Sequence, residues 1–296
     1  MSLANPSAPS EILRQERLEA EVTTRAQGPG RRRLSPSLTP AVATARGLRA
    51  TNQDRVCALR TLVGGEPAVL LAVADGIGGL PAGERSADLA VQVVGHYARY
   101  VIPEVPSGPP LRGVLADMLR AAGRWIWLWA RDQGHAGAAG STLVCALVWD
   151  RHYLVAHAGD SRCYRIGADR ATLLTRDHTE PARLEREDRQ ATIEGRPPLL
   201  RRLTSALGWP TDPVVEITPA EGSAGAFEDA AAMLVCSDGL HSCVSEEDMH
   251  DVLLETRGVD DACRRLVALA LERGSTDNVS VAAVEIGTLP RRSARA

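Results

Sequence analysis

Four aspartates stand at the ends of short apolar runs, and this placement limits how the chain can fold. Three of them, Asp75, Asp160 and Asp238, follow runs with the length and composition of β-strands. The fourth, Asp277, comes just before such a run at 279–284. In an antiparallel sheet the end of one strand lies beside the start of its neighbour, so we expect the four carboxylates to meet at one sheet edge. Gathered carboxylates repel one another unless a cation neutralises them, and an all-oxygen cluster suits Mg²⁺ or Mn²⁺.

The composition is that of a globular protein with a sizeable core. The chain has 296 residues, of which 44% are hydrophobic, and a formal net charge of −3. That charge is too small to indicate nucleic-acid or membrane binding, and the longest apolar run is too short to span a bilayer. The six cysteines form no CxxC pair, so we expect a reduced, cytoplasmic protein without a disulfide framework.

Local patterns divide the chain into two tails and one long domain. Residues 1–38 are rich in Pro, Ser, Ala, Glu and Arg and are expected to form a flexible tail, and residues 289–296 a second, basic tail. The polar, arginine-rich stretch at about 176–210 lacks a strand pattern and is expected to form a helical flap. Strands are predicted at 41–47, 55–62, 68–74, 141–149, 152–158, 161–167, 171–175, 213–218, 231–237 and 279–286. Helices are predicted at 83–100 and 111–133, from Ser245 with a capping-box-like start, and at 259–273.

Short turns between most of these strands indicate antiparallel sheets with the helices packed outside. Six motifs also occur in order along the chain: Arg49-x-x-Asn52-Gln53-Asp54, Asp75-Gly76-Ile77-Gly78-Gly79, Gly140-Ser141-Thr142, Gly159-Asp160-Ser161-Arg162, Ser237-Asp238-Gly239 and Asp277-Asn278. Each is common alone, but the ordered series resembles the bacterial form of the metal-dependent PPM/PP2C protein serine/threonine phosphatases.

The resemblance covers about residues 40–287 and implies a phosphatase domain over 39–288. It implies an α+β fold in which two packed antiparallel β-sheets form a central β-sandwich. Pairs of α-helices flank the sandwich on both sides (α-β-β-α), and a helical flap is attached to it.

The resemblance also assigns metal ligands. Asp75 would bridge two metal ions, the backbone carbonyl of Gly76 would bind the second ion, and Asp238 and Asp277 would bind the first. Asp160 matches the position of a weaker third metal. Taken singly, Asp-Gly and Asp-Asn sequences are also good turn formers, and that interpretation stays open for Asp160 in particular.

The remaining site residues concern the substrate and the attacking water. By resemblance, Arg49 would grip the substrate phosphate and Asp54 would orient water, although an arginine here could also form a surface ion pair. The family's animal members carry a histidine where this chain has Ile77, and many members carry an aspartate where it has Ser242. The first difference removes a histidine general acid, and the second weakens the case for a third metal.

Two histidines near these motifs need an interpretation of their own. His241 lies three residues after Asp238, close enough to donate a proton, but a satisfied or exposed histidine is the favoured interpretation. His178 is expected to be a structural hydrogen-bonding residue.

The expected function is hydrolysis of phosphoserine and phosphothreonine by direct attack of a water activated by a binuclear Mn²⁺ or Mg²⁺ centre. The expected partners are phosphorylated proteins, substrates of a serine/threonine kinase, and not nucleic acid or membrane; a monomer is expected. One alternative is a catalytically weak or inactive module of this kind that binds a phosphoprotein or kinase partner. A weaker alternative is a different two-metal phosphoesterase, such as a nuclease, but the chain has no basic, aromatic-interleaved stripe.

Overall fold

The computed structural model of the protein describes residues 38–79, 82–186, 202–222, 224–227 and 231–287. The chain divides into two units, Met1–Ser35 and Pro36–Ala296, and every described residue lies in the second. The predicted N-terminal tail up to residue 37, the predicted C-terminal tail and the middle of the predicted flap lie outside the described residues. No helix within the described part combines the length and apolar character needed to cross a bilayer.

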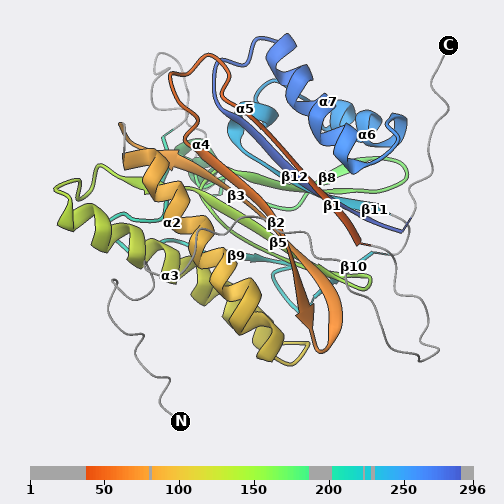
Figure 1. The fold of residues 1–296 in the computed structure, drawn as a ribbon, viewed down its shortest axis with the longest axis horizontal. Coiled ribbons are helices and arrows are strands. Elements are labelled where there is room, and N and C mark those ends of the chain that lie inside the picture. The colour runs from red at the N-terminus through yellow and green to blue at the C-terminus, as the bar shows by residue number, and fades with distance from the viewer. Residues whose placement is uncertain (1–37, 80–81, 187–201, 223, 228–230, 288–296) are drawn as a thin grey trace. The chain divides into compact units, whose positions relative to one another are not determined.

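Two antiparallel sheets form the centre of the fold (Figure 1). The first has five strands in the order β1 (Leu38–Ala45), β12 (Val279–Ile286), β11 (Ala231–Cys236), β7 (Arg162–Ile166) and β8 (Ala171–Leu173). The second follows the order β10 (Gly225–Ala226), β6 (His152–Ala158), β5 (Leu143–Trp149), β3 (Glu66–Ile77) and β2 (Asp54–Val63), with β4 (Gly140–Ser141) on β3 and β9 (Glu216–Thr218) on β6.

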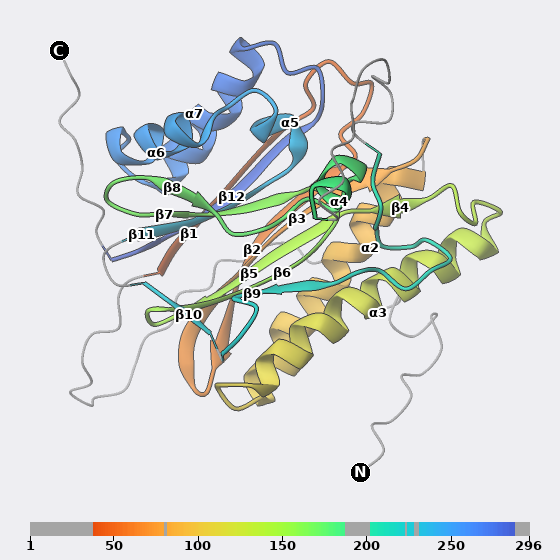
Figure 2. The same ribbon diagram turned by 180° about the vertical axis from the view of Figure 1, so that it is seen from behind.

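Helices cover the outer face of each sheet (Figure 2). The second sheet carries α2 (Ala82–His96) and α3 (Pro110–Asp132), and the first carries α6 (Glu246–Glu255) and α7 (Val259–Glu272), with short α5 (Asp238–His241) before them. Strand β5 shows why the layers form, because all seven of its residues are buried. Its alternate residues Leu143, Cys145 and Leu147 pack towards the helices, and Val144, Ala146 and Val148 pack into the core between the sheets. The predicted α-β-β-α architecture is therefore confirmed.

Several sequence-based boundaries differ from the structure; the strand predicted at 41–47, for example, is β1 at Leu38–Ala45. The helix predicted over 83–100 ends as α2 at His96 and continues as a π-helical turn, Tyr97–Val101, and a 3-10 turn, Ile102–Glu104. The strand predicted at 213–218 is limited to β9. Within the predicted flap the described residues contain one short helix, α4 (Glu180–Arg186). Residues 187–201 lie outside the described part of the chain, so the helical flap stays a prediction.

The capping box predicted at the start of α6 is confirmed and is tied to the end of α7. The Ser245 hydroxyl accepts a hydrogen bond from the Asp248 backbone N–H, and the Asp248 carboxylate accepts one from the Ser245 N–H at 2.9 Å. Arg273 donates to both oxygens of the same carboxylate. These bonds, those of Arg273 first, hold the pKa of Asp248 well below its ordinary value.

Asp248→Ala is expected to lower the free energy of unfolding by about 1–2 kcal/mol at neutral pH, measured by urea denaturation. A carboxyl whose pKa is depressed by folding stabilises the protein above its unfolded pKa, 3.8 here, and loses this effect as pH falls below it. The difference between Asp248→Ala and the wild type should therefore shrink below about pH 4. Glu247→Ala, an exposed residue of the same turn, is the control. A difference that stays constant down to pH 2 would contradict this account.

Candidate metal centre

The four strand-end aspartates lie at one end of the β-sandwich, but they come from both sheets. Asp75 belongs to β3 and Asp160 follows β6, both in the second sheet, whereas Asp238 follows β11 and Asp277 precedes β12 in the first. The expectation of a single sheet edge is therefore wrong. The cluster spans the two layers because each sheet brings one pair of strand ends to the same side.

Asp75 faces a fifth carboxylate, that of Asp54. The two residues are direct partners in the antiparallel ladder of β2 and β3, so their side chains share one face. Asp54 is 3% exposed and accepts a hydrogen bond from the Ser237 hydroxyl at 2.8 Å. Burial raises the pKa of Asp54 to about 6, against the effect of that bond, and the charges of Asp238 and Asp277 add to the rise.

The backbone around Asp75 is fixed by the motif Gly140-Ser141-Thr142. The Thr142 hydroxyl accepts from the Asp75 N–H at 3.0 Å, and the Thr142 N–H donates to the Asp75 carbonyl at 2.9 Å. The next residue, Gly76, packs so closely that a Cβ would lie 2.2 Å from the carbonyl oxygen of Gly83. Glycine is therefore required here by the close approach of α2 to the end of β3.

Asp238 and Asp277 are drawn together by a second close approach. Asp238 is the first residue of α5, and a Cβ on the following Gly239 would lie 2.0 Å from the carbonyl oxygen of Asn278. The side chain of Asn278 donates to the carbonyls of Arg46 and Thr51 at 2.7 and 2.9 Å. Asn278 therefore clamps the loop that precedes β2 onto the start of β12.

The clamped loop carries Arg49. Its Nη2 donates to Oδ2 of Asp277 at 2.6 Å, and its side chain is 58% exposed. The alternative of an ion pair is thus observed, but the partner is one of the predicted metal ligands. Arg49 therefore sits at the mouth of the cluster with a large part of its surface open to solvent.

Asp160 occupies a turn held by two histidines. Gly159, at φ +107°, donates from its backbone N–H to the ring nitrogen Nδ1 of His178 at 3.2 Å. The backbone N–H of His178 donates back to the Gly159 carbonyl at 3.0 Å. Nε2 of His241 donates to the carbonyl of Asp160 at 3.0 Å. Burial, then the repulsion of Arg162, lowers the pKa of His241 to about 4, so this ring is neutral at physiological pH and its Nε2–H serves a backbone carbonyl.

The buried carboxylates of the cluster repel one another, and a bound cation would relieve this repulsion. Burial raises the pKa of Asp75 well above its ordinary value. The carboxylates that raise it further are those of Asp54, Asp238, Asp160 and Asp277, in that order. Burial, followed by the charges of Asp238 and Asp177, raises the pKa of Asp160 to about 7. An all-oxygen set with this excess of negative charge fits Mg²⁺ or Mn²⁺, cations that take carboxylate and carbonyl oxygens as ligands.

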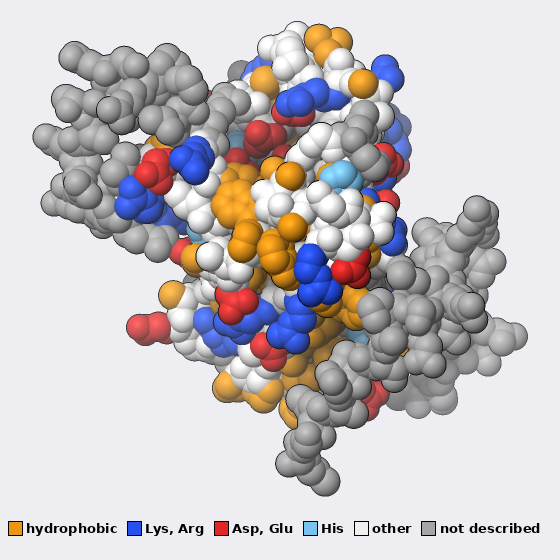
Figure 3. Space-filling view, turned by 90° about the vertical axis from the view of Figure 1, so that its left-hand side faces the viewer, with side chains coloured by type: hydrophobic (Ala, Val, Ile, Leu, Met, Phe, Trp, Pro, Cys, Tyr) orange, Lys and Arg blue, Asp and Glu red, His pale blue; other side chains and the backbone are white. Residues whose placement is uncertain are grey.

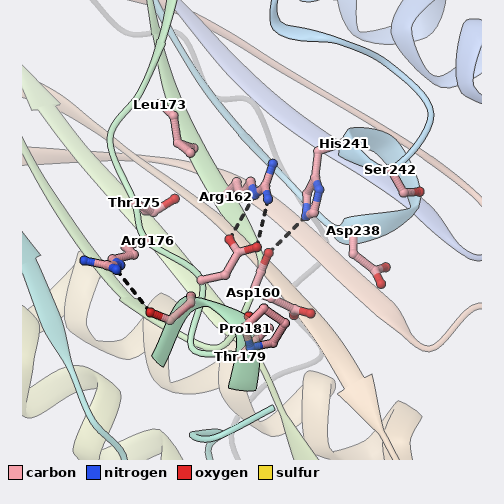
Figure 4. A pocket seen from close by; sticks show the side chains of 12 residues that line it. Asp160, Arg162, Leu173, Thr175, Arg176, Thr179, Pro181, Asp238, His241 and Ser242 are labelled. Carbon is pink, nitrogen blue, oxygen red and sulfur yellow. Dashed lines mark hydrogen bonds and ion pairs between the residues drawn. The ribbon is translucent and has the colours of Figure 1, made fainter. Parts of the chain in front are cut away.

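A cavity of about 470 Å³ opens beside Asp160 and Asp238 (Figure 4). Arg162 forms a two-bond ion pair with Asp177 in its wall, at 2.9 and 2.8 Å, and Arg176 reaches the carbonyl of Ala182 in α4. On the face of the molecule drawn in Figure 3, acidic side chains and arginines lie side by side. The sequence motifs indicated the acidic lining residues Asp160 and Asp238. They did not indicate Arg176 or Leu173, which belong to no motif and line the cavity because of the tertiary fold.

A sequence profile of the protein phosphatase 2C family matches residues 45–270. The chain belongs to the protein phosphatase 2C family. It is 31% identical over 260 residues to the serine/threonine protein phosphatase PstP of Mycobacterium tuberculosis. The aligned region covers 86% of this chain and 46% of PstP. The chain thus spans about half the length of that curated relative. It is 27% identical over 239 residues to the protein phosphatase PhpP of Streptococcus pneumoniae, covering 80% of the chain and 93% of PhpP.

Solved structures show the same phosphatase 2C fold. The S. agalactiae serine/threonine phosphatase superposes with a TM-score of 0.73 at 24% identity, covering 84% of this chain and 100% of that one. The catalytic domain of PstP in complex with two manganese ions superposes with a TM-score of 0.66 at 30% identity, covering 85% and 99%.

Proposed function

We propose that this chain is a Mn²⁺- or Mg²⁺-dependent protein serine/threonine phosphatase that hydrolyses phosphoserine and phosphothreonine. The observation that carries the proposal is the convergence of Asp75, Asp238 and Asp277 with two further carboxylates at one end of the sandwich. The phosphatase names of the relatives and the two manganese ions of the PstP structure support it.

The proposed ligands are the carboxylates of Asp75, Asp238 and Asp277 and the carbonyl of Gly76, holding two ions. Asp160 would help to hold a third ion, for which Ser242 supplies no carboxylate. When bound, such ions neutralise phosphoryl oxygens and lower the pKa of water, so that a nucleophile is available near neutral pH.

The chain's own residues would bind the phosphate and direct the attack. The guanidinium of Arg49 presents a planar fork that can hold two phosphoryl oxygens at once. Asp54, whose Oδ2 accepts a hydrogen bond from the Ser237 hydroxyl, faces Asp75 and would orient the attacking water. The position after Asp75-Gly76 is Ile77, and His241 is committed to the carbonyl of Asp160. A histidine general acid is therefore not part of this mechanism.

The proposed substrates are proteins phosphorylated by a serine/threonine kinase, and the proposed enzyme is a cytoplasmic monomer. The alternative of an inactive binding module is less favoured, because such a module would be expected to lose the proposed metal ligands, and Asp75, Asp238 and Asp277 are all present.

The proposal predicts Mn²⁺-dependent release of phosphate from a phosphothreonine peptide by the full chain. Asp238→Asn should reduce turnover by at least about 10³-fold, because metal ions supply several kcal/mol of transition-state stabilisation. Asp212→Asn, an exposed loop residue, is the matched control and should keep wild-type activity. Absence of turnover above the Asp238→Asn level in excess Mn²⁺ would overturn the proposed activity, and calorimetry would then show whether Mn²⁺ still binds.

A further inference from the structure

A second group of potential metal ligands contains none of the five aspartates. His157 of β6 and Glu216 of β9 are direct partners in an antiparallel ladder, so their side chains share one face. His178 joins them from the loop before α4, held by its two hydrogen bonds with Gly159. One ring nitrogen of each histidine and one carboxylate oxygen all lie within 4.8 Å of one another. The two rings are stacked with centroids 4.7 Å apart.

His157 has the protonation pattern of a metal ligand. Its Nε2 lies 2.8 Å from the carbonyl oxygen of Arg176, and since a carbonyl only accepts, Nε2 carries the proton. Nδ1 is then a bare lone pair. The residue is 1% exposed, and among the described residues Nδ1 has no hydrogen-bond partner. A histidine that ligates a metal characteristically donates its other ring N–H to a carbonyl or carboxylate in this way.

Burial lowers the pKa of His157 and so favours the neutral ring. A buried nitrogen lone pair without a donor costs free energy that a bound cation would recover. Glu216 is 31% exposed at its side chain and gives an ion a route to the group from solvent. The group is thus accessible from the Glu216 side while both imidazoles are shielded.

We propose that His157, His178 and Glu216 form a binding site for Zn²⁺ or a divalent cation with similar ligand preferences, such as Co²⁺. Two imidazole nitrogens and one carboxylate favour Zn²⁺ or Co²⁺ over the Mg²⁺ and Mn²⁺ that suit the aspartate cluster. Ligand atoms around a tetrahedral zinc ion are about 3.3 Å apart, given zinc–ligand bonds of about 2.0–2.1 Å. Nε2 of His178 and Oε1 of Glu216 are 3.6 Å apart, so this pair is close to that spacing and the wider pairs must close by at most about 1.5 Å.

Occupancy of this site and the Gly159–His178 hydrogen bond exclude each other. While Nδ1 of His178 accepts from the Gly159 N–H, the proton of the neutral ring must be on Nε2. A metal ion on Nε2 moves that proton to Nδ1, where it faces the Gly159 N–H and the hydrogen bond is lost. Gly159 immediately precedes Asp160, so a bound ion is expected to alter the turn that holds Asp160.

The test is a Co²⁺ titration of the full chain carrying Asp75→Asn and Asp238→Asn, which weaken the aspartate cluster. Tetrahedral Co²⁺ with nitrogen ligands absorbs visible light strongly, whereas octahedral Co²⁺ with oxygen ligands absorbs weakly. We expect a visible band that saturates at one Co²⁺ per chain and disappears when Zn²⁺ is added. In a parallel titration with diamagnetic Zn²⁺, the Gly159 amide signal should leave its metal-free position in a ¹⁵N spectrum.

Adding His157→Gln to this chain should weaken Co²⁺ binding by more than about 100-fold and remove the band. Glu216→Gln, at a partly exposed position, should do the same with less risk to folding, which circular dichroism checks. His152→Gln, on the same strand but exposed, is the control and should keep the band. A chain without the band, or a band that survives both His157→Gln and Glu216→Gln, would overturn the site.

Discussion

Replacing Asp75 with asparagine is expected to stabilise the metal-free protein and to abolish its stabilisation by Mn²⁺. Asp75 is buried against Asp54, its direct partner across β2 and β3. Two unit charges about 5 Å apart repel by about 3 kcal/mol at an effective dielectric constant of 20. Protonation relieves part of this repulsion, so the gain on removing one charge should be about 1–2 kcal/mol, or about 2–8 °C in Tm for a domain of this size.

The wild type, unlike Asp75→Asn, should be stabilised by Mn²⁺. At a Mn²⁺ concentration 100 times its Kd, binding adds about 2.7 kcal/mol to the stability of the folded state, which corresponds to about 5–11 °C. Asp75→Asn should show no such shift, because the proposed bridging carboxylate is gone. Thermal unfolding followed by circular dichroism, in EDTA and in excess Mn²⁺, measures both effects.

Asp212→Asn provides the comparison, since it removes an exposed carboxylate outside the cluster and should melt like the wild type in both buffers. A lower Tm of Asp75→Asn in EDTA would show that the carboxylate stabilises the metal-free fold. A retained Mn²⁺ shift would show that Asp75 is not the ligand on which binding depends.

The sequence predicted those features that depend on local pattern. Runs such as 68–74 and 141–149 have the length, composition and burial on both faces that a central strand requires, and they form β3 and β5. The capping box at Ser245 is likewise a local signal over four residues. The motif order then indicated the family, which carried the two-sheet architecture with it.

Features that depend on long-range pairing could not be predicted from the residues themselves. The facing of Asp54 and Asp75 follows from the register of β2 on β3, and the division of the aspartates between two sheets follows from strand order. The pairing of His157 with Glu216 joins residues 59 positions apart, 157 to 216, through the register of β6 and β9. Register is set by packing over whole faces, so it leaves little trace in the local sequence around either partner.

Arg49→Ala is expected to lower kcat/KM for a phosphothreonine peptide by on the order of 10²-fold, mainly through KM. Hydrogen bonds to charged groups contribute about 1.5–3 kcal/mol each, and a guanidinium fork can make two of them to one phosphate. Arg49 Nη2 contacts Oδ2 of Asp277 at 2.6 Å, so the fork lies beside a proposed metal ligand, where a substrate phosphate would have to bind. Arg49→Lys keeps the charge but not the fork and should recover only part of the loss.

The Mn²⁺ requirement distinguishes phosphate binding from metal binding at this position. Removing the Arg49 cation frees Oδ2 of Asp277, so the Mn²⁺ concentration for half-maximal activity should stay the same or fall in Arg49→Ala. Arg46→Ala is the control, because Arg46 is an exposed arginine of the same loop and its guanidinium makes only a long hydrogen bond, 3.3 Å, to the Ala50 carbonyl. This variant should keep kcat/KM within about threefold of the wild type. An increased Mn²⁺ requirement in Arg49→Ala with an unchanged KM at saturating metal would instead assign Arg49 to the support of Asp277, because loss of a supporting contact weakens metal affinity and leaves substrate binding intact.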